Sequence, residues 1–402
     1  MVKSVRKIKN LRGSRILLRS DFNVPMQDGK IEDDYKIVAG LSTIRFLLNN
    51  KCKVIVATHL GEPKFNKGKL SAKDRGDLST KNLALRLGKL LGRKVDFAND
   101  CIGKEVERKV RMMKEGDILF LENLRFYPEE ETDNKAFAKE LAKLADIYIN
   151  NAFAVSHRKH ASVSAIKKYL PAYAGFLVEQ EVRNLDKILL PEKPFVVVMG
   201  GAKISSKLRL LEKFAKNADH ILLSGALANT LLSILGHETG KSKVEKKDDK
   251  LVQALLKFYK KNGSKKIIFP VDFLVTQDKA GKGKTMIKTL NGIGKGDYIF
   301  DVGPKTISLY AKSIKKAKSI IWNGPLGMFE NKHFKHGTLA VAKIIAAKST
   351  GVAFGVVGGG ETVEALKMTK MFDYVDWVST GGGAMLSYLS GEDMPGLKNI
   401  LK

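Results

Sequence analysis

The stretch Val196–Glu212, VVVMGGAKISSKLRLLE, contains an apolar run, a pair of glycines and a helical pattern in direct succession. An apolar run without polar alternation is typical of a parallel strand that is buried on both faces. The glycines allow a tight turn, and the apolar residues after them repeat at helical spacing. The stretch therefore predicts one strand–turn–helix unit of a parallel α/β sheet.

Similar units recur along the chain, where short apolar runs alternate with lysine-rich amphipathic stretches. We expect strands at Arg15–Leu18, Lys53–Ala57, Asp117–Leu121, Ile147–Asn150, Phe195–Met199, His220–Leu223, Lys266–Phe269, Tyr298–Asp301, Ser319–Trp322 and Val352–Val357, all of them buried in parallel sheets. We expect helices at Lys81–Leu91, Asn134–Leu144, Ser205–Phe214, Asp249–Lys260 and Gly337–Ala347. The fold class is therefore α/β with doubly wound parallel sheets.

The length of the chain predicts two domains. It has 402 residues, more than the roughly 250–300 that usually share one hydrophobic core. Residues 171–194 have few strand signals and a long helical pattern, FLVEQEVRNLDKILL, which is typical of a connection between domains. The expected parts are an N-terminal domain (1–170), this connection (171–194), a C-terminal domain (195–385) and a tail (386–402).

The composition narrows the class of protein. Lys and Arg number 71 against 42 Asp and Glu, a formal net charge of +29. Because the basic residues are spread along the chain with acids among them, we expect solvated faces to carry most of this charge, with a nucleic-acid surface as the minority alternative. Cys52 and Cys101 lie far apart, so neither a disulfide framework nor a zinc site is indicated. With no secretory signal and no apolar span, we expect a cytoplasmic protein without membrane partners.

Glycines or polar residues follow strand after strand. In open parallel sheets, ligands bind beyond the carboxyl ends of the strands. The first half of the chain supplies Asp, Asn, His and Arg at these positions, whereas the second half supplies mainly glycines, as in Gly200-Gly201, Asn323-Gly324 and Gly358–Gly360. This difference predicts one domain for a small charged molecule and another for a nucleotide.

Two glycine motifs in the second half have both a functional and a structural interpretation. Lys203 and Lys207 share one face of a helix that begins at a glycine turn, which suits a phosphate, but they could also be solvated lysines after a tight turn. Glu361 in VVGGGETVEAL could cap its helix or hold Mg²⁺. Gly283-Lys284-Thr285 is not a P-loop, because Asp278 stands where a glycine is required.

Basic residues of the first half also allow two interpretations. The guanidinium groups of Arg125 and Arg158 match phosphate or carboxylate oxygens, although a lone surface arginine more often forms a salt bridge. His157 and His160 lack the zinc arrangement HExxH, so a metal site there is disfavoured. His59 follows a strand directly and could contact a ligand or belong to the core.

Ten motifs in a fixed order resemble the phosphoglycerate kinase family over about Arg15 to Gly396. They are LRSDFNVP, THLGEP, LENLRF, NAFAVSHRKHAS, MGGAKISSK, FPVDF, DVGPKT, WNGPLGMFE, VVGGGET and STGGGA. The resemblance implies two Rossmann-like domains facing a central cleft, a hinge that closes, and a tail that returns to the first domain. It also implies a monomeric glycolytic phosphotransferase with a carboxyl group as acceptor, which uses Mg²⁺ and no tightly bound organic cofactor. The N-terminal domain would bind 3-phosphoglycerate or 1,3-bisphosphoglycerate, and the C-terminal domain Mg-ADP or Mg-ATP.

The resemblance also assigns residues to the two substrates. Asp21 and Asn23 would hydrogen-bond the glycerate, and His59, Arg125 and Arg158 would surround its phosphate, while the other positions of this substrate site would be Phe22, Lys36, Leu60, Gly61 and Glu62. Lys203, together with Lys36, would be catalytic through its contact with the transferring phosphoryl group. The nucleotide site would comprise Gly201, Ala202, Lys203, Lys207, Gly225, Asn323, Gly324, Glu330, Gly358, Gly359, Gly360, Glu361 and Thr362, with Glu361 at the metal.

Four positions depart from the pattern of the family. Lys36 and Glu62 replace arginines, Ser206 replaces an aspartate, and Glu361 replaces the aspartate expected at the metal. A carboxylate facing an anion is unfavourable, so we expect Glu62 to turn away and to pair with a lysine such as Lys64. Two alternatives to an active kinase are a divergent paralogue that transfers phosphate poorly and a nucleic-acid-binding protein. Against the second, no basic stretch is interleaved with aromatic residues.

Overall fold

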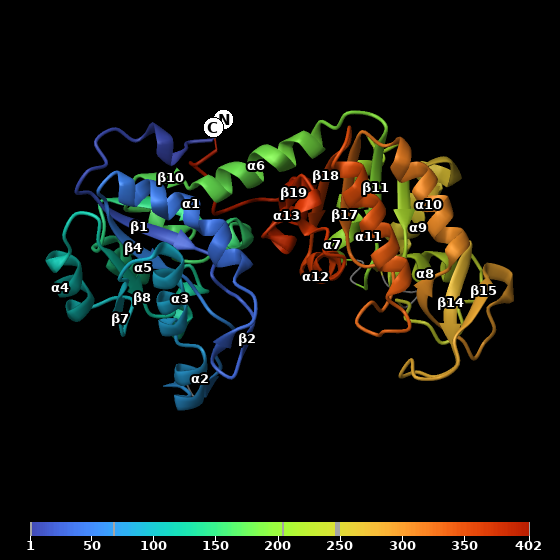
Figure 1. The fold of residues 1–402 in the computed structure, drawn as a ribbon, viewed down its shortest axis with the longest axis horizontal. Helices are drawn as coiled ribbons and strands as arrows, with labels where there is room; N and C mark the ends of the chain where they lie inside the picture. The colour runs from blue at the N-terminus through green and yellow to red at the C-terminus, as the bar shows by residue number, and fades with distance from the viewer. Residues whose placement is uncertain (1, 67–68, 203–204, 246–249, 402) are drawn as a thin grey trace. The chain divides into compact units, whose positions relative to one another are not determined.

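The computed structural model describes residues 2–66, 69–202, 205–245 and 250–401, which form two compact units (Figure 1). The first unit comprises the chain up to Arg183 together with the residues from Glu392 onward. The second is Asn184–Gly391. Helix α6 (Phe176–Leu189) begins in the first unit and ends in the second.

The first unit contains a six-stranded parallel sheet in the order β10-β9-β1-β4-β8-β7. Its strands are β1 (Arg15–Ser20), β4 (Lys53–Ala57), β7 (Asp96–Ala98), β8 (Ile118–Leu121), β9 (Ile147–Asn151) and β10 (Ala172–Ala174). The chain builds the sheet outward from β1, first on one side with β4, β7 and β8 and then on the other with β9 and β10, so the sheet is doubly wound. The four strands predicted in this half are confirmed, while the short edge strands β7 and β10 were not predicted.

Helices and two small hairpins complete the first unit. The helices are α1 (Tyr35–Asn49), α2 (Ala72–Asp77), α3 (Lys81–Leu91), α4 (Lys104–Met112) and α5 (Lys135–Ala142). The hairpins pair β2 (Met26–Gln27) with β3 (Lys30–Ile31) and β5 (Phe65–Asn66) with β6 (Lys69–Leu70). Helix α3 has the predicted bounds, and α5 is shorter than the predicted helix by one residue at its start and two at its end.

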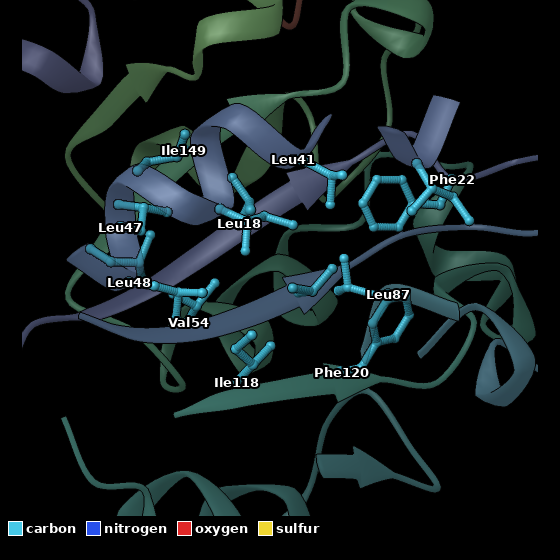
Figure 2. Close-up of a cluster of buried hydrophobic side chains, with 14 of the residues drawn as sticks. Leu18, Phe22, Leu41, Leu47, Leu48, Val54, Leu87, Ile118, Phe120 and Ile149 are labelled. Atoms are coloured by element: carbon cyan, nitrogen blue, oxygen red, sulfur yellow. The ribbon is translucent and has the colours of Figure 1, made fainter. Parts of the chain in front are cut away.

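The core of the first unit lies between α1, α3 and the sheet (Figure 2). Strand residues including Leu18, Val54 and Phe120 meet Leu41 of α1 and Leu87 of α3, and all five are at most 5% exposed. Burying one such side chain stabilises the fold by about 1.5–3 kcal/mol, and each strand contributes several. The packing therefore fixes the position of each strand end, and so also the position of the residues that follow each strand.

The second unit contains a six-stranded parallel sheet in the order β13-β12-β11-β17-β18-β19. Its strands are β11 (Phe195–Met199), β12 (His220–Leu223), β13 (Ile267–Ile268), β17 (Ser319–Asn323), β18 (Phe354–Gly358) and β19 (Trp377–Val378). The chain runs outward from β11 to β13 and then crosses to β17 on the other side. Strands β11 and β17 therefore flank the switch point, where ligands bind in doubly wound sheets.

Seven helices of the second unit are described. They are α7 (Ser205–Ala215), α8 (Gly225–Ile234), α9 (Lys250–Lys266), α10 (Pro304–Lys316), α11 (His336–Ser349), α12 (Gly360–Met368) and α13 (Gly382–Ser390). Helices α7, α9 and α11 match the three predicted in this half to within a residue or two, except that α9 extends six residues beyond the predicted end.

One predicted strand belongs to a different sheet. Strand β16 (Tyr298–Val302) pairs antiparallel with β14 (Asp272–Thr276), which also pairs antiparallel with β15 (Met286–Thr289). The prediction of a parallel strand at Tyr298–Asp301 was therefore wrong. The first three residues of β16 are only half-buried, and a short apolar run by itself does not distinguish the two kinds of pairing.

The C-terminal residues pack on the first unit. Leu397 and Ile400 are buried, and the Lys3 amide donates a 2.7 Å hydrogen bond to the Ile400 carbonyl. The Asn150 side chain donates to the Gly396 carbonyl over 3.0 Å. The Lys167 ammonium donates to the carbonyls of Pro395 and Lys398. Polar and apolar contacts together hold the two ends of the chain on one unit.

Candidate active site

Asp21 follows β1 in the first unit, and its carboxylate is buried but only partly paired. Lys36, in the first turn of α1, donates a 2.8 Å hydrogen bond to Oδ2 of Asp21. Oδ1 lies 3.8 Å from Nδ1 of His59 and has no hydrogen-bond partner among the described residues. A buried acceptor without a partner is costly, so this oxygen is suited to accept a hydrogen bond from a ligand.

His59 follows β4 and is buried beside four cationic side chains. Burial holds the pKa of His59 well below its usual range, and the charges of Arg19, Arg125, Lys36 and Arg158 lower it further. The ring is therefore neutral near pH 7. Since Nη2 of Arg19 lies 3.3 Å from Nδ1 and can only donate, Nδ1 is the acceptor and the proton sits on Nε2.

Arg19 lies within β1 and is held by a buried network. Its Nε donates to the Ser162 hydroxyl over 2.8 Å, and its Nη2 lies 3.8 Å from Oε1 of Glu130. Glu130, fully buried, also accepts from the amide and the hydroxyl of Ser162. Sequence reasoning did not single out Arg19. The signal was an arginine that directly follows the apolar run Ile16–Leu18 within a strand predicted to be buried.

Arg125, in the turn after β8, is buried with only part of its guanidinium paired. Its Nη1 donates to the Gly61 carbonyl over 2.7 Å, and its Nε lies 3.1 Å from the Glu131 carboxylate without hydrogen-bond geometry. Its Nη2 is buried without a hydrogen-bond partner among the described residues. Burial lowers the pKa of Arg125, although the guanidinium stays charged. Such a group can bind an anion strongly.

Arg158 adds to the positive charge around Arg125. It is half-buried, and its charge lowers the pKa values of His59, His157 and His160 as well as that of Arg125. Arg19, Lys36, Arg125 and Arg158 thus form one electropositive cluster at the strand ends. A small molecule with several negative charges matches such a cluster.

The remaining sequence-predicted residues of the first unit have different surroundings. Oδ1 of Asn23 accepts a 2.9 Å hydrogen bond from the Gly61 amide, which ties the two turns together. The side chains of Phe22 and Leu60 lie in the hydrophobic core, so only their backbone could reach a ligand. Glu62 is exposed, and its charge raises the pKa of Arg125.

The expected pairing of Glu62 with Lys64 is wrong, because these two described residues form no ion pair. The Lys64 amide instead donates to the Asp74 carboxylate. The charge of Glu62 raises the pKa of Arg125, so its field reaches the electropositive cluster. An exposed carboxylate there weakens the field that an anion meets.

In the second unit, the turns after β11 and β17 meet at the switch point. The Gly200 amide donates to the Asn323 carbonyl, and the Gly201 amide to the Pro325 carbonyl. Gly324 has a φ of +90°, and a Cβ added there would lie 2.3 Å from the Gly200 carbonyl oxygen. Only glycine allows this approach.

The side chain of Lys207 extends from α7 to the point where these two turns meet. The side chain is buried, and its ammonium donates to the Gly200 carbonyl. A Cβ on Gly324 would also lie 2.9 Å from this ammonium. Lys207 therefore supplies a positive charge between the two glycine turns. Lys203 and the side chain of Ser206 lie outside the described residues.

Asn323 and Thr362 connect the turns after β17 and β18. Nδ2 of Asn323 donates to the Gly358 carbonyl, and the Thr362 hydroxyl accepts from the Gly324 amide, each over 2.7 Å. Helix α12 begins at the turn after β18 and helix α8 at the turn after β12, and neither has a side-chain cap on its first amides. Uncapped helix N-termini next to Gly359 and Gly225 offer N–H groups to an anion.

A cavity of about 350 Å³ adjoins these turns within the second unit. Its lining combines the predicted Gly201, Ala202, Gly225, Glu330 and Glu361 with apolar side chains, among them Phe273, Ile299, Leu326 and Met328. This size and mixture suit a small organic group that is held by apolar contacts and a few polar ones. Phe273 and Ile299 come from the antiparallel sheet, which sequence reasoning did not connect with the site.

Asp301 lines the same cavity from β16. Its carboxylate accepts hydrogen bonds from the amides of Val302, over 2.9 Å, and Gly337, over 2.7 Å, the latter in the first turn of α11. Burial nevertheless raises the pKa of Asp301 to about 7. Asp301 therefore positions α11 and changes charge near neutral pH.

Two carboxylates at this cavity could serve a ligand. Glu361, exposed in the first turn of α12, and Glu330, also exposed, both line the cavity. Among the described residues, no three or more His, Cys, Asp or Glu side chains form a group that could hold a metal ion by themselves. A single carboxylate such as Glu361 is nevertheless compatible with Mg²⁺. This ion usually keeps several waters and binds only one or two carboxylates, together with substrate phosphates.

The helices in the described part of the chain include none with the length and apolar character needed to cross a membrane.

The chain is similar to known proteins over nearly its whole length. The family model of phosphoglycerate kinase matches residues 5–392. The phosphoglycerate kinase of Dictyoglomus turgidum is 42% identical over 97% of this chain and 96% of its own, and that of Desulforudis audaxviator is 43% identical over 99% and 98%.

Solved structures agree with these relatives. Phosphoglycerate kinase from Coxiella burnetii has a TM-score of 0.85 at 35% identity, covering 100% of this chain and 99% of its own. The enzyme from Pyrococcus horikoshii has a TM-score of 0.84 at 31% identity, covering 99% and 98%. The motifs, the two doubly wound sheets and these matches agree, and the chain belongs to the phosphoglycerate kinase family.

Proposed function

We propose that this protein transfers a phosphoryl group reversibly between 1,3-bisphosphoglycerate and ADP, yielding 3-phosphoglycerate and ATP, as a step of glycolysis and gluconeogenesis. Membership of the family supports this reaction. The observation that carries the proposal is the electropositive cluster, in which Nη2 of the buried Arg125 has no hydrogen-bond partner among the described residues. A phosphorylated carboxylic acid supplies the charges that such a cluster needs.

The first unit is the domain that binds phosphoglycerate. Asp21 accepts a hydrogen bond from the glycerate hydroxyl and Asn23 forms another with it, while Arg125 and Arg158 hold the phosphate with His59 as a neutral donor. Lys36 lies against Asp21 and can reach the carboxyl oxygen that takes part in the transfer. The backbone of Phe22 and of Leu60–Glu62 forms the edge of this site.

The second unit is the nucleotide domain. The uncapped N-termini of α8 and α12, the glycines at 358–360 and Lys207 bind phosphate oxygens, while Asn323 and Thr362 hold the turns in place. The adenine lies in the cavity near Gly225, and Glu330 binds the ribose. Glu361 holds Mg²⁺, which supplies positive charge to the phosphates when it is bound.

The reaction itself requires little covalent chemistry from the protein. In the direction of ATP use, a carboxylate oxygen of 3-phosphoglycerate bonds to the γ-phosphorus as the bond to the β-phosphate oxygen breaks, and ADP leaves. Lys203 and Lys36 stabilise the charge on the transferring group. Because the reactants bind to different units, a hinge motion must bring them in line and exclude water.

The protein acts in this proposal as a cytoplasmic monomer without a sequence-specific nucleic-acid partner. The proposed reaction uses residues of a single chain and so requires no oligomer. Gel filtration at working concentration tests whether the protein is a monomer.

The decisive experiment measures ADP formation from Mg-ATP and 3-phosphoglycerate in a coupled assay, with Lys203→Ala and an exposed control, Lys139→Ala. We expect rapid turnover that the first substitution lowers by two orders of magnitude or more and the control leaves within about twofold. Nucleotide binding without turnover would identify a divergent paralogue instead. Turnover of Lys203→Ala within about threefold of the wild type would remove Lys203 from the catalytic residues.

A further inference from the structure

Asn229 lines the cavity of the second unit and has an unsatisfied carboxamide. It lies in α8 four residues after Gly225, so both residues lie on one face of the helix, and both line the cavity. Only 4% of Asn229 is exposed, and its side chain has no hydrogen-bond partner among the described residues. A carboxamide contains one acceptor and two donors, and burying them unpaired is unfavourable. The group is therefore suited to bond to a ligand in the cavity.

The other polar side chains of the lining are charged and have different surroundings. Both carboxylate oxygens of Asp301 already accept hydrogen bonds from backbone amides. Glu330, Glu361 and Lys243 are exposed, so water can satisfy their charged groups. In the part of the lining that the structure describes, Asn229 thus has the one side chain that is polar and uncharged.

The surroundings of Asn229 are mostly apolar. Phe273 and Ile299 reach the cavity from the antiparallel sheet, whereas Leu326 and Met328 follow β17. Small organic ligands are typically held by such an apolar lining together with a few polar groups that fix their orientation. A phosphate prefers a charged partner, so an uncharged carboxamide in these surroundings suits the polar edge of a neutral ring better.

We propose, on the basis of the proposed function, that Asn229 recognises the adenine of the nucleotide. Its carboxamide oxygen accepts a hydrogen bond from the exocyclic amino group, and its nitrogen donates to the adjacent ring nitrogen. Adenine presents this donor and this acceptor side by side, and asparagine matches such a pair in a bidentate contact. Asn229 therefore acts on the base, whereas Lys207 and the glycine turns act on the phosphates.

The test compares two ligands that differ in one group. Calorimetry with the full chain measures the dissociation constants of ADP and of purine riboside 5′-diphosphate, which lacks the exocyclic amino group. Asn229→Leu keeps the branched shape of the side chain without its hydrogen-bonding groups, and Asn229→Ala is measured alongside because it requires no additional space. The control, Ser233→Ala, removes a hydroxyl from the last turn of the same helix, outside the cavity lining. Thermal unfolding checks that each variant is folded.

We expect the wild type and Ser233→Ala to bind the purine analogue about tenfold more weakly than ADP, because the analogue leaves the buried carboxamide oxygen without a partner. In Asn229→Leu and Asn229→Ala the two ligands should bind within about twofold of each other, mainly because the affinity for ADP falls.

Two results would overturn the role of Asn229 while leaving the proposed kinase intact. The first is wild-type affinity for the analogue equal to that for ADP, in a protein that binds ADP and turns over. The second is a tenfold preference for ADP that persists in the Asn229 variants, which would assign the amino group to another partner. Failure of the wild type to bind ADP at all would instead overturn the nucleotide domain, and the role of Asn229 with it.

Discussion

Each of the two units has its own doubly wound parallel sheet, and in both the candidate site lies at the carboxyl ends of the strands. The two sites differ in the groups that they present to a ligand. In the first unit, buried acidic and basic side chains line the surface, as in Asp21, Arg19 and Arg125. In the second, glycines bring the backbone close, as at Gly324 and Gly200. The two surfaces suit the two proposed substrates: fixed guanidinium groups match a compact anion, whereas amides that only residues without a Cβ can expose match a chain of phosphates.

Removing a charge from the first unit should have the largest effect. Arg125→Ala deletes the guanidinium whose Nη2 is buried without a partner, so we expect kcat/KM for 3-phosphoglycerate to fall by about 100-fold or more. The KM for ATP should change by less than about threefold, because the residue belongs to the other unit.

The matched control for this experiment is Arg111→Ala, which removes an exposed arginine from an i,i+4 ion pair in α4. Steady-state kinetics with each substrate varied in turn separate the two effects. If both arginine variants kept wild-type kinetics, the electropositive cluster would not be the site of phosphoglycerate binding.

Adding a methyl group to the second unit should have the next largest effect. In Gly324→Ala the new Cβ would collide with the Gly200 carbonyl and approach the Lys207 ammonium. We expect the affinity for ADP, measured by calorimetry, to fall by about tenfold or more, while the KM for 3-phosphoglycerate is nearly unchanged.

Gly236→Ala is a close control, because Gly236 has a φ of +92° but an added Cβ would meet nothing within 4 Å. It imposes the same backbone strain, about 1–3 kcal/mol, without the collision. The difference between the two variants thus measures the close approach of the strand turns. Equal losses of ADP affinity would attribute the effect to strain alone.

The two units should also respond oppositely to acid. Burial lowers the pKa of His160 in the first unit from 6.5 to about 3, so the unfolded state binds more protons between these values and the first unit loses stability as pH falls through them. Burial raises the pKa of Asp301 in the second unit from 3.8 to about 7, so the second unit loses stability as pH rises through that range.

Hydrogen exchange followed by mass spectrometry, with peptides from each sheet, measures the two units separately between pH 4 and 7. His160→Gln should reduce the pH dependence of the first unit alone, leaving the part that His59 and His157 contribute, and Asp301→Asn should reduce that of the second. A common pH slope in both units, unaffected by either substitution, would contradict the opposite titrations.

The smallest effect is expected at Glu62, which weakens the field of the electropositive cluster from an exposed position. Glu62→Arg should lower the KM for 3-phosphoglycerate by about two- to fivefold and leave that for ATP unchanged. The gain should shrink as salt increases, because exposed charges are screened. Glu105→Arg, an exposed change in α4, is the charge-matched control, and an unchanged or higher KM in Glu62→Arg would show that no arginine is missing there.

Local patterns were sufficient for most elements of the two parallel sheets. Lys53–Ala57 and Phe195–Met199 have the predicted bounds, since an apolar run flanked by lysine-rich helices has few alternatives in such a fold. The edge strands β7, β10 and β19 were not predicted, because a strand of two or three residues is too short to show a periodic pattern. Strand β16 was assigned to the wrong kind of sheet, since its partner β14 was not predicted and pairing depends on residues far away in the chain.

For the candidate site, the sequence by itself determined which residue types follow each strand and, through ten ordered motifs, the family. Their pairing was decided only by the tertiary structure. Arg19 meets His59 and Ser162 from positions 40 and 143 residues away, and Glu62 lies free of Lys64 although the two are near neighbours in the chain. The physical reason is that burial and charge act through space. The packing of strands that are distant in the chain determines which polar groups are buried and which charges lie near them. A local sequence pattern contains neither kind of information.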